Sequence, residues 1–169
     1  PKPKSSNSHN ANNFSILIVG AGMSGILMGI KLLDLGIPVQ IYEKNNDVGG
    51  TWFENTYPGC RVDIANHFYS YSFEENNQWS QYFSEQPELQ DYFHKCFFKY
   101  NLNEITHFNQ EVSALTFSDA TNMWSVTSSC DEQPRVEEFN LVISCIGQLN
   151  QPKLPEINGL DLFEGKIFH

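Results

Sequence analysis

Three glycines with the spacing G-x-G-x-x-G, in the segment GAGMSG, are the first residues of the sequence that could do chemistry: Gly20, Gly22 and Gly25. Between a strand and a helix, such glycines permit a tight turn, a close approach of backbone to a pyrophosphate, and close packing of helix on strand. Glu43 follows Gly25 by 18 positions, where a carboxylate can accept hydrogen bonds from ribose hydroxyls. Glycines also serve ordinary turns, but this context favours dinucleotide binding. The motif leaves FAD and NAD open, whereas the acid disfavours NADP at this particular site.

Hydrophobic patterning predicts the strands and the helix around this motif. The apolar run FSILIVG, residues 14–20, predicts a strand covered on both faces, and residues 23–35 predict a helix that Gly36 ends. Residues 38–44 predict a second strand with Glu43 near its end. A strand, a helix and a strand within about thirty residues form a βαβ unit, so the sheet is expected to be parallel.

Later segments predict a mixed α/β chain. Residues 49–73 are rich in Gly, Pro and aromatic residues without a clear period, which is typical of a functional loop. A helix is expected from Pro87. Strands are expected at residues 105–108, at 111–117 and 123–128 as a hairpin or meander, and at 139–147 as another buried strand.

Composition narrows the class of protein. The 169 residues carry 20 acidic and 10 basic side chains, a net charge of −10, which argues against nucleic-acid and anionic-membrane partners. The longest apolar stretches are interrupted by glycines and charges, so no membrane span is expected. The four cysteines form no C-x-x-C pair, which predicts reduced thiols in a cytoplasmic protein, and the five histidines show no metal-ligand spacing.

The segment GTWFENTYPGCRVD is the most specific in the chain. Taken alone, Trp52 could be a core residue and Asp63 an exposed or helix-capping carboxylate, which are the commoner fates of these residue types. The segment as a whole resembles a signature of the Baeyer–Villiger monooxygenases, G-x-W-x-x-x-x-Y-P-G-x-x-x-D, and favours an active-site role for Asp63. Its six matching positions are Gly50, Trp52, Tyr57, Pro58, Gly59 and Asp63.

A second resemblance to this family lies at the end of the sequence. Phe163, Gly165 and His169 fill the first half of the family fingerprint F-x-G-x-x-x-H-x-x-x-W. The resemblance spans residues 14–169 and implies a Rossmann-like FAD-binding domain at 14–150. Residues 151–169 would then be a linker that leads to an NADPH domain and a C-terminal remainder absent from this sequence. Residues 1–13, rich in Pro, Ser and Asn, are expected to be flexible.

The resemblance implies an enzyme that uses FAD, NADPH and O₂ to convert a small-molecule ketone into an ester or lactone through a C4a-peroxyflavin. It implies that Asp63 pairs with an arginine contributed by a later part of the enzyme. Arg61 and Val62 would lie with it toward the nicotinamide, and Val112 would contact the adenine end of FAD through its backbone. The full expected cofactor-binding set is Gly20, Gly22, Ser24, Gly25, Glu43, Gly50, Thr51, Trp52, Arg61, Val62, Asp63, Tyr69, Val112 and Gly147.

Two alternatives stay open at this point. A flavin monooxygenase that oxidises nitrogen or sulfur shares the glycine motifs, although both the Y-P-G-x-x-x-D segment and the Phe-Gly-His fingerprint disfavour it. A non-catalytic nucleotide-binding module is the other alternative, because a Rossmann unit does not by itself imply chemistry. Residues 57–73, YPGCRVDIANHFYSYSF, further resemble the aryl-ketone branch of the Baeyer–Villiger family, typified by 4-hydroxyacetophenone monooxygenase.

Overall fold

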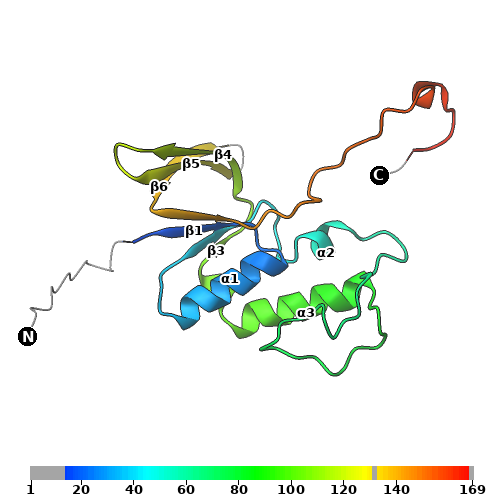
Figure 1. Cartoon of the computed structure of the whole chain (residues 1–169), viewed down its shortest axis with the longest axis horizontal. Coiled ribbons are helices and arrows are strands. Elements are labelled where there is room, and N and C mark those ends of the chain that lie inside the picture. Colours follow the sequence, from blue (N-terminus) through cyan, green and yellow to red (C-terminus); the bar gives the residue numbers. More distant parts are fainter. Residues whose placement is uncertain (1–13, 131–132, 168–169) are drawn as a thin grey trace, which may run out of the picture.

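The computed structural model describes residues 14–130 and 133–167, so the flexible segment expected at residues 1–13 and the expected fingerprint residue His169 lie outside it. A four-stranded parallel sheet forms the centre of the molecule, with the order β3-β2-β1-β7 (Figure 1). The bounds are β1, Ile16–Val19; β2, Gln40–Tyr42; β3, Thr106–His107; and β7, Leu141–Ser144. This order places the first strand between the second and the last, as in dinucleotide-binding folds.

Two helices cover one face of this sheet, α1 at Met23–Asp34 and α3 at Gln86–Lys99. Pro87 lies in the first turn of α3, where its missing N–H leaves no intrahelical bond unmade. The buried residues of α1 recur at helical spacing, and those of α3 do likewise, so each helix presents one apolar stripe to the sheet. These residues are Gly25, Ile26, Gly29 and Ile30 in α1, and Leu89, Tyr92, Phe93, Cys96 and Phe97 in α3.

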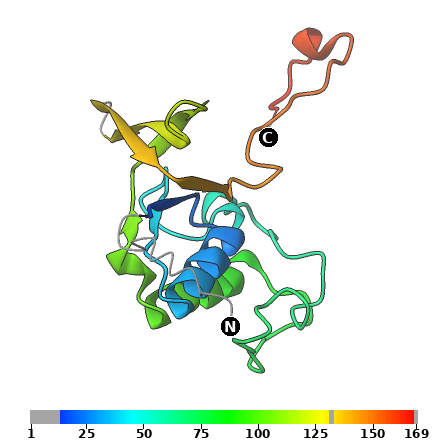
Figure 2. The same cartoon turned by 60° about the vertical axis from the view of Figure 1, so that its left-hand side comes forward.

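An antiparallel three-stranded sheet covers the opposite face, as Figure 2 shows. Its strands are β4, Glu111–Ser118; β5, Met123–Cys130; and β6, Gln133–Phe139. Side chains alternate across a strand, so β1 serves both layers: Ile16 and Ile18 join the core beneath the helices, and Leu17 joins a second core with Val126 of β5. The central strand β1 is therefore buried between two layers.

The described chain also contains three short helices and two long segments without helix or strand, residues 55–85 and 145–159. The helices are α2, Thr51–Glu54; η2, Leu102–Glu104; and η3, Leu160–Leu162. Beyond β7 the chain runs away from both sheets in an extended path, and its apolar side chains are exposed, among them Leu149 and Phe163 (Figure 1). Within the described residues, no helix combines the length and the apolar character that a bilayer crossing requires.

The expected α/β fold with a parallel sheet and a β-meander is confirmed, but two local expectations are wrong. The strand expected at 139–147 is two elements, because Phe139 ends β6 and β7 begins at Leu141. It is also not buried, since β7 is an edge strand and Leu141 is exposed. The sequence reading also missed α2 and all of β6 before Phe139.

Candidate dinucleotide-binding site

The loop between β1 and α1 can be built only with glycine at its first position. Gly20 has φ +99°, in the region that side chains disfavour, and its N–H donates to the carbonyl of Tyr42 at 2.8 Å. A Cβ atom at this position would lie 2.8 Å from the carbonyl oxygen of Cys145. Gly20 therefore sits tightly between the ends of β2 and β7, at the carboxyl edge of the sheet.

Gly25 brings α1 against this turn. A Cβ atom on Gly25 would lie 1.9 Å from the carbonyl oxygen of Gly20, so any side chain would push the helix away from the strand. The helix has no side-chain cap at Gly22, and among the described residues the N–H groups of Met23 and Ser24 donate to no acceptor. These free N–H groups and the helix dipole suit an anion such as a pyrophosphate.

Glu43 is joined to the glycine turn directly. Its carboxylate is buried, with one oxygen accepting the N–H of Ala21 at 2.7 Å and the other the N–H of Asn45 at 2.8 Å. Each carboxylate oxygen has a second lone pair, so these bonds leave acceptor capacity for a ribose hydroxyl. The acid at the end of β2 thus fixes the backbone of the turn, and its ribose contact stays a prediction.

The second glycine segment lies against the first. The N–H of Gly49 donates to the carbonyl of Ala21 at 3.0 Å, and Gly50 has φ +56°. A Cβ atom on Gly50 would approach the Cα of Gly22 to 3.0 Å. The two glycine motifs, about thirty positions apart in sequence, therefore form one backbone surface, which continues into Thr51 at the start of α2.

Trp52 and Tyr69 form a pair beside this surface. The indole N–H of Trp52 donates to the hydroxyl of Tyr69 at 3.1 Å, and the two rings meet edge to face. Trp52 is buried and Tyr69 half-buried in the same apolar core. The two aromatic residues expected near FAD are thus brought together by the structure.

The segment from Tyr57 to Asp63 begins with a turn. The N–H of Cys60 donates to the carbonyl of Tyr57 at 3.1 Å, and Gly59 has φ +81°, as the third position of a type II turn requires. Val62 is buried, whereas Asp63 is exposed, and no hydrogen bond among the described residues involves the Asp63 carboxylate. Arg61 forms an ion pair with Glu85 at 2.7 Å, a contact that the sequence did not indicate.

Val112 and Gly147 each follow a residue that contacts Glu43 or the glycine turn. Gln110, two residues before Val112, donates its N–H to the carbonyl of Glu43 at 2.9 Å, so the start of β4 lies beside the ribose candidate. Gly147 has φ +74° and follows Cys145, whose carbonyl faces Gly20. The strands that carry Val112 and precede Gly147 thus reach Glu43 and the glycine turn, whereas no contact among the described residues joins Asp63 to that turn.

A buried polar network under the Asp63 segment was missed. The amide of Asn66, fully buried, donates to the hydroxyl of Ser84 and accepts the N–H of Ser84 at 3.1 Å. The Ser84 hydroxyl in turn donates to Glu88, and Glu88 also accepts the N–H and hydroxyl of Ser80 at 2.8 and 2.9 Å. Only the spacing of Ser84 and Glu88, four apart at the start of a helix, could have signalled it.

This network predicts an acid-dependent loss of stability. Partial burial acts to raise the pKa of Glu88, but the hydrogen bonds from Ser84 and Ser80 outweigh it and lower that pKa. Because the folded-state pKa lies below the unfolded value, the stabilisation is present above about pH 4.3 and is lost as the pH falls through the folded-state pKa. Glu88→Gln should reduce the free energy of unfolding by about 1 kcal/mol at pH 7 and flatten its decline on acidification.

Urea unfolding at pH 7 and pH 4 measures this difference. Glu75→Gln is the matched control, because Glu75 is exposed and takes part in no hydrogen bond or ion pair of the described residues. A Glu88→Gln protein with the wild-type pH dependence would contradict the role of the network.

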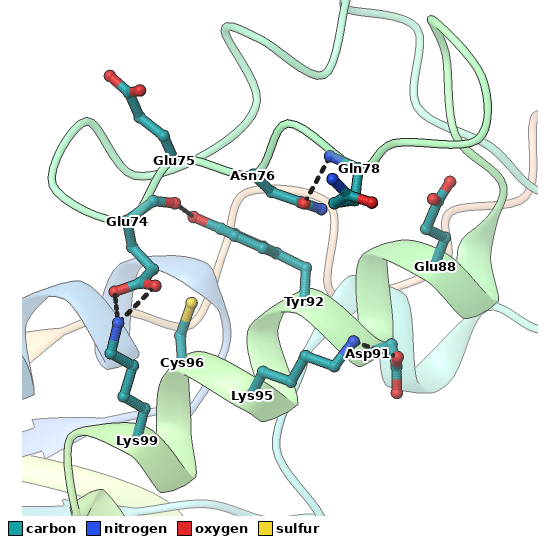
Figure 3. Close-up of a pocket in the computed structure, with 10 residues that line it drawn as sticks. All are labelled: Glu74, Glu75, Asn76, Gln78, Glu88, Asp91, Tyr92, Lys95, Cys96 and Lys99. Atoms are coloured by element: carbon teal, nitrogen blue, oxygen red, sulfur yellow. Dashed lines mark hydrogen bonds and ion pairs between the residues drawn. The ribbon is translucent and has the colours of Figure 1, made fainter.

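Two hollows of the described surface are lined by no residue of the glycine motifs. One, of about 270 Å³, runs along α3 between Glu74 and Glu88 (Figure 3). Figure 3 shows the Glu74 carboxylate paired with Lys99 at 2.7 Å, and burial raises the pKa of the nearby Cys96 thiol to about 11. A protonated thiol and a closed ion pair are no reaction centre. The other hollow, of about 440 Å³, is bordered by His67 and Asn77.

Known proteins with similar sequences include this part of the chain. The family model described as an NAD(P)-binding Rossmann-like domain matches residues 18–86, which include both glycine motifs and Glu43. A Baeyer-Villiger monooxygenase of Pseudomonas aeruginosa is 40% identical over 160 residues, which are 94% of this chain and 30% of that protein. The FAD-binding monooxygenase ktnD of Aspergillus niger is 35% identical over 172 residues, covering 95% of this chain and 28% of that protein.

Solved structures agree with these relatives. A crystal structure of OTEMO in complex with FAD and NADP superposes with a TM-score of 0.80 at 31% identity, covering 93% of this chain and 30% of that one. A closed crystal structure of cyclohexanone monooxygenase gives a TM-score of 0.78 at 30% identity, covering 90% of this chain and 30% of that one. The chain thus spans about 30% of the length of the relatives it matches.

Proposed function

Because this chain is related to the Baeyer–Villiger monooxygenases over nearly all of its length, we propose that it is the FAD-binding portion of such an enzyme. The whole protein would use FAD, NADPH and O₂ to convert a ketone into an ester or lactone. The observation that carries this proposal is the single backbone surface made by Gly20–Gly25 and Gly49–Gly50, with the buried Glu43 bonded to it. FAD, when bound, supplies the oxygen-activating redox chemistry.

The residues around this surface fit a flavin dinucleotide. The free N–H groups at the start of α1, including that of Ser24, would hold the pyrophosphate, and Glu43 would accept the ribose hydroxyls. The backbone of Val112 would contact the adenine end. Gly50, Thr51, Trp52, Tyr69 and Gly147 would line the path toward the flavin ring.

Arg61, Val62 and Asp63 would act on the NADPH side. The ion pair with Glu85 holds the Arg61 guanidinium at the surface, and Val62 anchors the segment in the core. Exposed and without a partner among the described residues, the Asp63 carboxylate would pair with an arginine from the remainder of the enzyme, fixing its position and charge. Residues 14–150 would form the FAD domain, and 151–169 a linker to the NADPH domain.

An assay of the full-length enzyme tests this function. The purified protein should be yellow with a flavin spectrum, should oxidise NADPH faster when a ketone is added, and should release an ester or lactone with one oxygen atom from O₂. Oxidation of an amine or sulfide with no ester from any ketone would instead support the nitrogen- or sulfur-oxidising alternative. A protein with no bound flavin would support a nucleotide-binding module. Residues 1–169 alone should show no oxygenation.

A further inference from the structure

Two glutamines of α3 reach the second glycine segment, and the proposed FAD contacts do not use them. Gln86 and Gln90 are four positions apart and so lie on one face of the helix. The side-chain amide of Gln86 donates to the carbonyl of Trp52. That of Gln90 donates to the carbonyl of Val48 at 2.7 Å. The two bonds bracket the segment 48–52 at both ends, just where the glycine pair passes into α2.

The amide oxygen of Gln90 is also placed in an unusual way. It is buried and accepts no hydrogen bond from the described residues, although a buried amide oxygen without a partner is energetically unfavourable. It faces Gly49 so closely that a Cβ atom there would lie 2.0 Å from it. The bond to Val48 therefore dictates which way the amide points, and the φ of +125° at Gly49 is one that favours glycine there.

The segment that Gln90 holds is bonded onward to the glycine turn. The N–H of Gly49 donates to the carbonyl of Ala21, and Gly50 packs on the Cα of Gly22. A continuous path therefore joins the side chain of Gln90 to the backbone that would face the pyrophosphate. None of these contacts requires Gln90 to touch the cofactor.

From these contacts we propose that Gln90, assisted by Gln86, is a positioning residue of the FAD site. It fixes the Gly49–Gly50 backbone against Gly22 and thereby sets the width of the surface that receives the dinucleotide. This inference rests on the proposed FAD-binding function and adds to it a residue that acts through the backbone of Val48 and Gly49. A purely space-filling side chain at position 90 could not replace the amide.

Two substitutions in the full-length protein test the proposal. Gln90→Met keeps the length of the side chain without a donor, and Gln90→Glu keeps its shape but replaces the donor with a second acceptor facing the Val48 carbonyl. Both should weaken FAD binding to the apoprotein about tenfold, as fluorescence titration measures, which corresponds to the loss of one buried hydrogen bond. The visible circular dichroism of the bound flavin should change as well, because the backbone beside it is no longer held.

Lys95→Met is the matched control on the same helix, since it removes only an exposed ion pair with Asp91 and should leave the FAD dissociation constant unchanged. Wild-type affinity and flavin spectrum in both Gln90 variants would overturn the proposal. So would failure of both variants to fold, because Gln90 would then be a general stability element. A wild-type protein that binds no flavin would contradict the proposed function itself. That result is distinct from the wild-type affinity of the Gln90 variants, which would contradict only the role of Gln90.

Discussion

Replacing Gly25 with alanine is expected to weaken FAD binding at least 100-fold. The new Cβ would lie 1.9 Å from the carbonyl oxygen and 2.9 Å from the carbonyl carbon of Gly20, and neither backbone atom can turn away as a side chain could. The start of α1 would have to move off β1, which displaces the N–H groups of Met23 and Ser24 from the proposed pyrophosphate position. The free energy of FAD binding should become less favourable by about 3 kcal/mol, a cost typical of such overpacking. Titration of the apoprotein with FAD measures it.

Gly29→Ala is the matched control, one turn further along the same helix. A Cβ on Gly29 would meet only the side-chain methyls of Ile41 and Leu102, at 3.0 and 3.1 Å, and these can shift slightly. This variant should bind FAD within threefold of the wild type. Equal losses in the two variants would mean that helix packing in general, rather than the contact with Gly20, governs flavin affinity.

Replacing Asp63 with alanine is expected to lower kcat for ketone oxygenation about 100-fold in the full-length enzyme while FAD binding stays unchanged. In the proposed function this carboxylate holds a catalytic arginine, and loss of one member of a hydrogen-bonded charge pair costs about 3 kcal/mol. Because Asp63 is exposed and bonds to none of the described residues, the substitution should not reduce the stability of this portion. Steady-state kinetics, flavin content and thermal unfolding together separate these effects.

Asp91→Ala is the control for a lost surface carboxylate. Asp91 pairs with Lys95 at 2.9 Å on the exposed side of α3, so its removal should change kcat by less than twofold. An Asp63→Ala enzyme within threefold of the wild-type rate would remove Asp63 from the proposed site and leave the FAD-binding proposal standing.

The elements with strong local patterns could be predicted from the sequence. Local sequence patterns predict the apolar strand before Gly20 and the helix that ends near Gly36. They also predict the strands β4 and β5. The β6 strand was missed because its residues include Pro134 and several charges, which an edge strand of an antiparallel sheet tolerates. Pairing with β5 makes this segment a strand, although its own sequence has no strand pattern.

Some features of the candidate site could likewise be predicted from local sequence, and others could not. The glycine spacing and Glu43 predicted a turn with an acid beside it, and the structure joins them through the N–H of Ala21. The contacts that tie α2 and the Asp63 segment to the residues around the start of α3 could not be predicted, because their partners lie more than twenty positions away. Gln86 bonds to the carbonyl of Trp52, and the N–H of Val62 donates to the carbonyl of Ser84. Such contacts leave no period or spacing in the sequence.

The pairing of β1 with β7 has a consequence for biosynthesis. Ser15 and Asn140 are bonded although 125 positions separate them, and Gly20 is enclosed only when Cys145 lies beside it. Contacts of such long range slow folding, and a nascent chain emerges from its amino terminus. Most of this sequence must therefore be synthesised before β1 can pair with β7. In the proposed function, FAD would therefore bind only after most of this sequence has been synthesised.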